Sequence, residues 1–213
     1  MTKAKLKTCK NCGKKYEPSR PLQVACSMKC GVEHVYKLKE KKQSESLKES
    51  KSVNKVKREQ LKSLSDYKNE LQKHVNLIAR LIDINCPCIS SGRSVGKMAG
   101  GHRFSVGAFD NLRFNLLNIW QQSFADNTYK SGNADGFDST LKGYLIYDEV
   151  HALNAKYPFI KLQKPDLAEK IVIAKEIIKE IKLFNKEYTE CRRLPYLRVE
   201  LRRQYNSELG IYL

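Results

Sequence analysis

Two short cysteine pairs near the start of the chain constrain its fold more than any other feature. Cys9-Lys10-Asn11-Cys12 and Cys26-Ser27-Met28-Lys29-Cys30 are separated by thirteen residues. Four thiolates in this arrangement suit a closed, tetrahedral structural zinc site. A segment of about 30 residues cannot bury enough apolar surface to fold alone, so a bound metal would supply the folding free energy. The alternatives are redox cysteines or a chance arrangement.

The residues around these cysteines fit a zinc knuckle. Gly13 follows the first pair and frees the backbone so that amides can point at thiolate sulfur. Ser27 is well placed to cap a helix that begins at the second pair. The knuckle would carry eight basic side chains, which favours DNA contact over the alternative of protein docking: Lys3, Lys5, Lys7, Lys10, Lys14, Lys15, Arg20 and Lys29.

Positive charge is concentrated on particular parts of the chain. The formal net charge is +17, and the first 30 residues hold eight Lys/Arg against one acid. Residues 134–190 hold nine Lys/Arg against ten acids, so the excess avoids that segment. A surplus confined to particular modules indicates phosphate binding. A solvated basic surface, or contact with an anionic membrane, is the alternative.

We expect a cytosolic protein, in the bacterial host's cytoplasm if the chain is phage-encoded. The basic N-terminus lacks the apolar core of a secretory signal. The longest apolar stretch, residues 77–84, is interrupted by Arg80 and Asp83 and is too short to span a bilayer. In the cytosol, closely spaced cysteines are more often metal ligands than disulfides.

The fold class that we predict is α+β and mostly helical. Residues 32–65 contain no Pro or Gly and predict a long exposed basic helix, which is either solvated, a DNA-tracking helix or a short coiled coil. Apolar residues at helical spacing predict further helices over 66–84, 141–155 and 167–188. The inward residues of these three helices would be Leu71, Val75, Ile78, Leu81 and Ile82; Leu145, Val150 and Leu153; and Leu167, Ile171, Ala174, Ile178 and Ile181.

Between Gly101 and Gly132 lies a sparse pattern of one histidine and two asparagines, His102, Asn118 and Asn127. This spacing suits a compact ββα nuclease site, in which an imidazole takes a proton from water. An amide holds that imidazole, and an oxygen ligand one helix away seats a divalent cation beside a phosphate. Two other histidines, His74 and His151, are interpreted as packing or surface residues.

Several segments of the chain resemble the NinG (Rap) family of phage recombination proteins. The strongest match covers residues 9–30 and 87–133, and weaker similarity covers most of the chain. The matching segments are Pro87-Cys88-Ile89-Ser90-Ser91-Gly92, Gly101-His102-Arg103-Phe104-Ser105-Val106-Gly107, Leu112-Arg113-Phe114-Asn115 with Asn118-Ile119, and Asn127 with Lys130-Ser131-Gly132-Asn133. The resemblance implies an HNH-type endonuclease that cleaves branched DNA, such as Holliday junctions, with Mg²⁺ or Mn²⁺.

The resemblance also implies a role for individual residues. His102 would be the general base, Asn118 would orient its ring, and Asn127 would be the ligand of the catalytic cation. Two further residues would contact DNA, Arg103 and Lys130. Two others, Arg113 and Asn115, would either contact DNA or fix the loop. The domains would then be a zinc-binding knuckle (1–31), a basic helical linker (32–65), an HNH-like ββα core with flanking helices (66–160), and a C-terminal helix with a basic tail (161–213).

The chain departs from the family pattern around this site. The family has Cys-x-x-Cys pairs on both sides of the hairpin, whereas this chain has Cys88 with Ser91 and Ser123 with Asp126. One thiolate, one carboxylate and two hydroxyls make a poor zinc site, so we predict no zinc there. Packing by aromatic residues would replace the metal: Phe104, Phe109, Phe114, Trp120 and Phe124. Ala99 stands where the family has an acid or amide that would be a metal ligand.

Three functions are therefore open. The first is a metal-dependent endonuclease acting on branched DNA, which would work as a homodimer if it cuts a junction symmetrically. The second is a non-catalytic, zinc-containing DNA-binding accessory of recombination with a degraded site. The third is a protein-docking adaptor with negligible DNA affinity.

Overall fold

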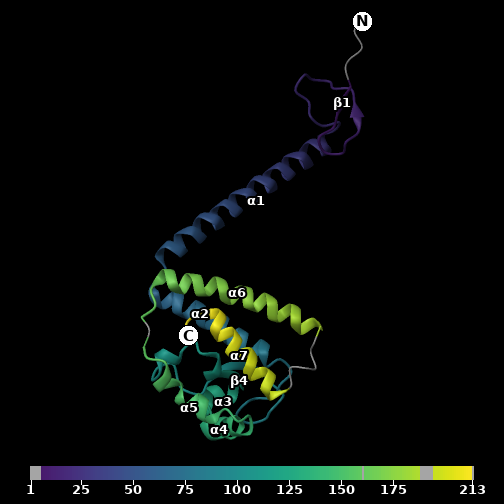
Figure 1. Cartoon of the computed structure of the whole chain (residues 1–213). Coiled ribbons are helices and arrows are strands. Elements are labelled where there is room, and N and C mark those ends of the chain that lie inside the picture. The colour runs from purple at the N-terminus through teal and green to yellow at the C-terminus, as the bar shows by residue number, and fades with distance from the viewer. Residues whose placement is uncertain (1–5, 160, 188–193, 213) are drawn as a thin grey trace. The chain divides into compact units, whose positions relative to one another are not determined.

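A computed structural model describes residues 6–159, 161–187 and 194–212 of the chain (Figure 1). It divides into two compact units, Met1–Lys62 and Ser63–Leu213. We describe each unit by itself. Within the described residues, no helix has both the length and the apolar character needed to cross a membrane.

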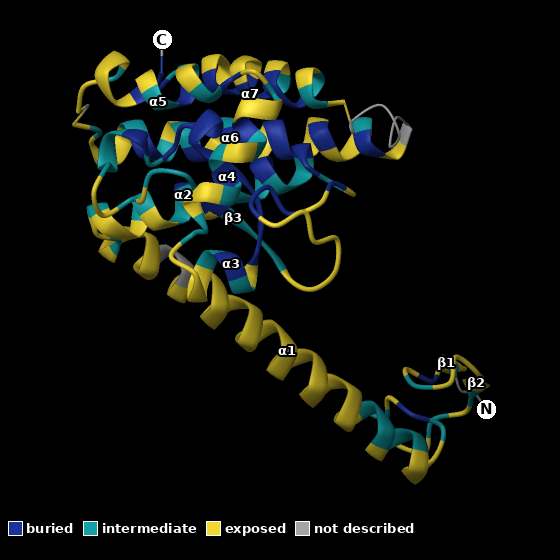
Figure 2. Cartoon of the chain, turned by 90° about the horizontal axis from the view of Figure 1, so that it is seen from below, coloured by how far each residue is buried: buried dark blue, intermediate teal, exposed yellow. Residues whose placement is uncertain are grey.

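The first unit consists of a small cysteine-rich module and one long helix. Strands β1 (Lys7–Thr8) and β2 (Lys15–Tyr16) pair antiparallel, and α1 runs from Met28 to Leu61. The predicted cap is confirmed, because the Ser27 side chain accepts a hydrogen bond from the Cys30 amide. The helix therefore begins inside the predicted 1–31 module rather than after it. From Val35 onward every described residue of α1 is exposed (Figure 2).

In the second unit, helices α2 (Leu64–Ile82) and α6 (Lys164–Glu187) pack against each other and form much of one core. Ser63 and Asp66 form a capping box that fixes the start of α2. The inward residues predicted for α6 are all buried, as are those of α2 except the partly buried Leu81. The predicted pattern for both helices is therefore confirmed.

Between these helices the chain forms two antiparallel strands followed directly by a short helix. Strand β3 (Met98–His102) pairs with β4 (Ile119–Ser123), so that His102 lies opposite Ile119. The connecting loop contains two 3₁₀ turns, η1 (Asp110–Leu112) and η2 (Leu116–Asn118), and α3 (Phe124–Tyr129) follows β4. Ile119 belongs to the core formed with α2 and α6, and Trp120 to a second core, since successive strand residues point to opposite faces.

The single helix predicted over residues 141–155 is wrong. The chain forms α4 (Ala134–Gly143) and α5 (Tyr147–Lys156), separated by a turn in which Leu145 has a positive φ of 59°. Leu145 was predicted to face inward but is exposed, because the turn directs it to solvent. Val150 and Leu153 of α5 are buried, as predicted.

Helix α7 (Pro195–Leu209) corrects the prediction of a separate, basic C-terminal tail. Arg198 and Arg202 are buried, and both guanidinium groups bind Asp83 at the end of α2. The Arg202 guanidinium also lies 3.5 Å from the centre of the Trp120 ring. Residues 161–213 and 66–160 therefore belong to one compact unit. Arg192 and Arg193, two basic residues of the same predicted segment, lie outside the described residues.

Candidate metal centre and hairpin site

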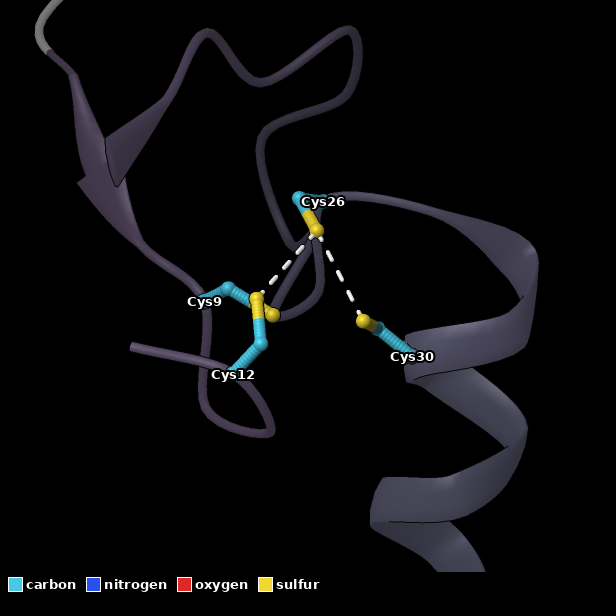
Figure 3. Close-up of side chains that lie close together, drawn as sticks. All are labelled: Cys9, Cys12, Cys26 and Cys30. Carbon is cyan, nitrogen blue, oxygen red and sulfur yellow. Dashed lines mark hydrogen bonds between the residues drawn. The ribbon is translucent and has the colours of Figure 1, made fainter. Parts of the chain in front are cut away.

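The four N-terminal cysteines converge on one point. Cys9 and Cys12 lie on the turn after β1, Cys26 precedes α1, and Cys30 lies in the first turn of α1 (Figure 3). The four sulfur atoms lie within 4.8 Å of one another, with Sγ–Sγ distances of 3.6 Å for Cys12–Cys26 and 3.7 Å for Cys26–Cys30. In a tetrahedron with Zn–S bonds of about 2.3 Å, the sulfur atoms are about 3.8 Å apart. The four cysteines could therefore hold a zinc ion.

The backbone around Cys9 favours its thiolate form. Gly13 has a φ of +72°, a left-handed conformation that its lack of a side chain permits, as the sequence predicted. Hydrogen bonds from the backbone amides of Cys12 and Cys26 lower the pKa of Cys9 to about 6. A thiolate is the form that binds a metal. Among the described residues of this unit, the buried apolar side chains are Cys9 and Ala25, so a metal would be its main cross-link.

The second candidate site lies where β3 ends. The His102 side chain is mostly buried, with Nε2 3.0 Å from the Arg113 carbonyl oxygen and 3.3 Å from the Gln72 amide nitrogen. Burial lowers the pKa of His102, and the Arg113 charge lowers it further, although the hydrogen bond to the Arg113 carbonyl acts in the opposite direction. The imidazole is therefore neutral at pH 7.

Asn118 does not orient the His102 ring as predicted. Its Oδ1 accepts a hydrogen bond from the Phe104 amide at 2.8 Å, and its Nδ2 donates to the carbonyl oxygens of Phe104 and Leu112. The side chain is fully buried and closes the loop between the two strands. The Arg113 carbonyl and Gln72, rather than Asn118, contact the ring.

Asn127 lies on α3, the helix that was expected to carry it, and its side chain is partly buried. The loop after α3 returns towards His102, because a Cβ added to Gly132 would lie 4.0 Å from the His102 carbonyl oxygen. Gln122 of β4 donates hydrogen bonds to the carbonyl of Gly132 and to Ser90 Oγ. These contacts hold the loop after α3 beside β3 and β4.

The four residues that were expected not to form a second zinc site, Cys88, Ser91, Ser123 and Asp126, come together around the carboxylate of Asp126. Ser91 Oγ and Ser123 Oγ donate to Asp126 Oδ2 at 2.5 and 2.6 Å, and Cys88 Sγ lies 3.5 Å from the same oxygen. Hydrogen bonds from Ser123 and Ser91 hold the pKa of Asp126 far below its usual range. We call these four residues the Asp126 cluster. It joins the segment before β3 to the junction of β4 and α3.

The aromatic brace predicted in place of a metal is only partly correct. Phe114 and Trp120 are buried, but Phe124 is exposed and lies outside both cores. The role of Asp126 as a hydrogen-bond centre was missed. Ser123-x-x-Asp126 has the spacing of a helix N-terminal capping pair, which was the available signal, and the Asp126 amide does donate to Ser123 Oγ.

Two of the four residues assigned to DNA have other partners. Asn115 is fully buried, where it caps η2 and accepts a hydrogen bond from Asn206 of α7. It has no surface to offer to DNA, so that assignment is wrong and its alternative role in fixing the loop is correct. Arg103 binds Asp138 through two hydrogen bonds of 2.5 and 2.7 Å, and His151 Nε2 lies 3.2 Å from the same carboxylate.

The other two residues assigned to DNA retain some exposure. Arg113 donates to Asn69 and lies 3.5 Å from Asp110, so its guanidinium is mostly covered. Lys130 is half exposed, with its ammonium 3.2 Å from Asp126 Oδ1. DNA contact by either residue stays a prediction.

Comparison with known proteins identifies the family. Residues 1–186 match the family model described as Bacteriophage Lambda NinG protein. Protein ninG of Escherichia phage lambda is 32% identical over 147 residues, which cover 62% of this chain and 72% of that protein. Protein ninG of Salmonella phage P22 is 31% identical over the same length and the same shares. No solved structure matches the chain. Because the family model spans most of its length, this chain belongs to the NinG family of bacteriophage proteins.

Proposed function

We propose that this protein is an endonuclease of phage recombination that hydrolyses phosphodiester bonds in branched DNA, with His102 as the general base. Membership in the NinG family supports the link to recombination, and the hydrolytic reaction is proposed from the chemistry that His102 can perform. A zinc ion bound by Cys9, Cys12, Cys26 and Cys30 would hold the N-terminal module together.

The state of the His102 ring is the observation that carries this proposal. The Arg113 carbonyl oxygen can only accept a hydrogen bond, so we assign the proton of the neutral imidazole to the ring nitrogen 3.0 Å away, Nε2. The Gln72 amide nitrogen, 3.3 Å from the same Nε2, is itself a donor and then makes a contact without a hydrogen bond. The other nitrogen, Nδ1, then has a free lone pair. A neutral imidazole with one nitrogen held by a carbonyl and the other able to accept a proton is suited to deprotonate water.

Charge supports DNA as the partner. The chain has a net charge of +17. Every lysine of α1 whose side chain is described is solvent-exposed. Lysines that neutralise phosphates release counterions, so affinity for DNA would fall steeply as salt is raised. A homodimer acting on one junction is part of the same proposal. It predicts that the cuts are symmetric.

The described residues offer few ligands for the expected catalytic cation. Mg²⁺ and Mn²⁺ prefer carboxylate and water oxygens. Of the described residues, only the four cysteines form a group of three or more acidic, Cys or His side chains able to hold a metal. Asp126, the acid on α3, is buried in its own cluster. This favours a second candidate function, a non-catalytic DNA-binding accessory protein of recombination.

A cleavage assay separates the two functions. The zinc-loaded protein is incubated with a labelled four-way junction or a linear duplex of matched sequence, with added Mg²⁺, with Mn²⁺, or with neither. Omission of the metal is better than a chelator, which would also remove zinc from the cysteines. We expect cleavage of the junction in preference to the duplex. Salt-sensitive binding of the junction without nicking in any arm would support the accessory function instead.

A further inference from the structure

Helix α3 carries an aromatic pair that no core absorbs. Tyr129 is 78% exposed and Phe124 is 39% exposed, and their ring centres lie 6.2 Å apart in an edge-to-face arrangement. Neither ring belongs to either hydrophobic core. Exposed large aromatic side chains gathered in one place are a common feature of binding surfaces.

Two lysines flank this pair. The Lys97 ammonium lies 5.1 Å from the centre of the Phe124 ring, and Lys97 itself is exposed just before β3. Lys130 follows Tyr129 directly and is half exposed, with its ammonium 3.2 Å from Asp126 Oδ1. An apolar ring surface bordered by cations complements a ligand that has both a flat apolar face and a negative charge. A nucleotide has this combination, because its base stacks on an aromatic ring while its phosphate meets a cation.

The backbone under the pair is firmly held. The Phe124 amide donates to the Lys97 carbonyl at 2.9 Å, and Asp126, between the two aromatic residues, is fixed by Ser91 and Ser123. Phe124 follows Ser123, which pairs with Met98 at the opposite end of β3 from His102. Four residue steps along the strand separate these ends by about 13 Å, which is about four base-pair steps of 3.4 Å.

We propose that Phe124 and Tyr129 form a stacking platform for unpaired nucleobases, and that this platform selects DNA with unpaired bases over continuous duplex. In a duplex the faces of the bases are already stacked on one another, so exposed rings gain little from it. A branch point, bulge or single strand offers free base faces. The proposal rests on the proposed action on DNA, and it names the structural feature of the substrate that the hairpin region recognises.

The test compares Tyr129→Leu and Phe124→Leu with Tyr196→Leu. Leucine retains apolar bulk but removes the ring, and Tyr196 is a matched control because it is 67% exposed on α7 and belongs to neither core. Affinities are measured for a duplex with a three-base bulge and for the same duplex without it. We expect Tyr129→Leu to weaken binding to the bulged DNA by about tenfold, as loss of one base–aromatic stack would, with duplex affinity almost unchanged.

A direct readout of stacking completes the test. With 2-aminopurine in the bulge, wild-type protein and Tyr196→Leu should change the fluorescence of the base, and Tyr129→Leu should reduce that change. Equal affinity of Tyr129→Leu and Tyr196→Leu for bulged DNA would overturn the platform and would favour a protein partner for the rings. An equal loss of affinity of Tyr129→Leu for the bulged and the continuous duplex would also overturn it. If wild-type protein binds neither DNA, the proposed function itself fails.

Discussion

Replacing Asp83 with asparagine should sharply destabilise the second unit. The Asp83 carboxylate is buried and accepts hydrogen bonds from Arg198 Nε at 2.9 Å, Arg202 Nη2 at 2.6 Å and the Gln121 amide at 2.7 Å. It therefore joins α2, β4 and α7. Asparagine keeps the shape but removes the charge, which leaves two buried guanidinium groups without a counter-ion.

The burial of this ion pair sets the size that we expect for the effect. Removing one partner of a buried ion pair costs about 3–5 kcal/mol, which for a unit of this size lowers Tm by about 6–20 °C. Trp120 is the single tryptophan of the chain and lies against Arg202, so its fluorescence reports the unfolding of this unit. The control is Asp110→Asn. Asp110 pairs with Lys68 near the surface, and its loss should cost about 0.2–1 kcal/mol.

Acid should reduce the difference between wild-type protein and Asp83→Asn. Burial alone would raise the pKa of Asp83, but the charges of Arg202 and Arg198 outweigh burial and hold the pKa below its ordinary value. A carboxylate with a depressed folded-state pKa contributes its stability above the unfolded-state pKa, near 4, and loses it as pH falls through the folded-state pKa. Equal stability of wild-type protein and Asp83→Asn at pH 7, measured by Trp120 fluorescence, would refute this account of the core.

Three other predictions follow from local geometry. Gly136→Ala should lower the Tm, because the added Cβ would lie 2.0 Å from the Ser90 carbonyl oxygen, and this clash should outweigh the helix preference of alanine, about 1 kcal/mol. The control is Gly143→Ala in the same helix, whose Cβ would meet no atom within 4 Å and should not lower the Tm. Asp126→Ala should cost about 1–3 kcal/mol in denaturant unfolding, since it leaves buried donors without an acceptor. Wild-type protein should bind one zinc ion per chain by elemental analysis, and Cys12→Ser should weaken that binding; an equal affinity would exclude Cys12 as a ligand.

Features set by local sequence were predictable. The spacing of the cysteines, the cap at Ser27 and the helical periodicity of α2 and α6 all depend on residues a few positions apart. The buried position of Arg202 was not predictable in this way. Its counter-ion, Asp83, lies 119 residues earlier in the chain, and an arginine near the end of a basic chain is ordinarily a surface residue.

The candidate site shows the same division. The sequence predicted Asn127 on a helix beyond His102, and in the structure Asn127 lies on α3 while His102 ends β3. It could not show that Asn118 bonds to the backbone of the loop, because the loop conformation decides which groups come within reach. Asn115 was misassigned for a similar reason, since Asn206, 91 residues later, covers it.

Single-turnover cleavage of a four-way junction by His102→Ala is the most direct test of the proposed function. Protein is held in excess over DNA and above the dissociation constant, so that the rate reports chemistry alone. His74→Ala is the control, because His74 is a partly buried histidine of α2 for which no chemical role is proposed. We predict that His102→Ala loses about 10²–10⁴-fold in rate with junction affinity almost unchanged. Equal rates for His102→Ala and His74→Ala would contradict the role of His102 as the general base.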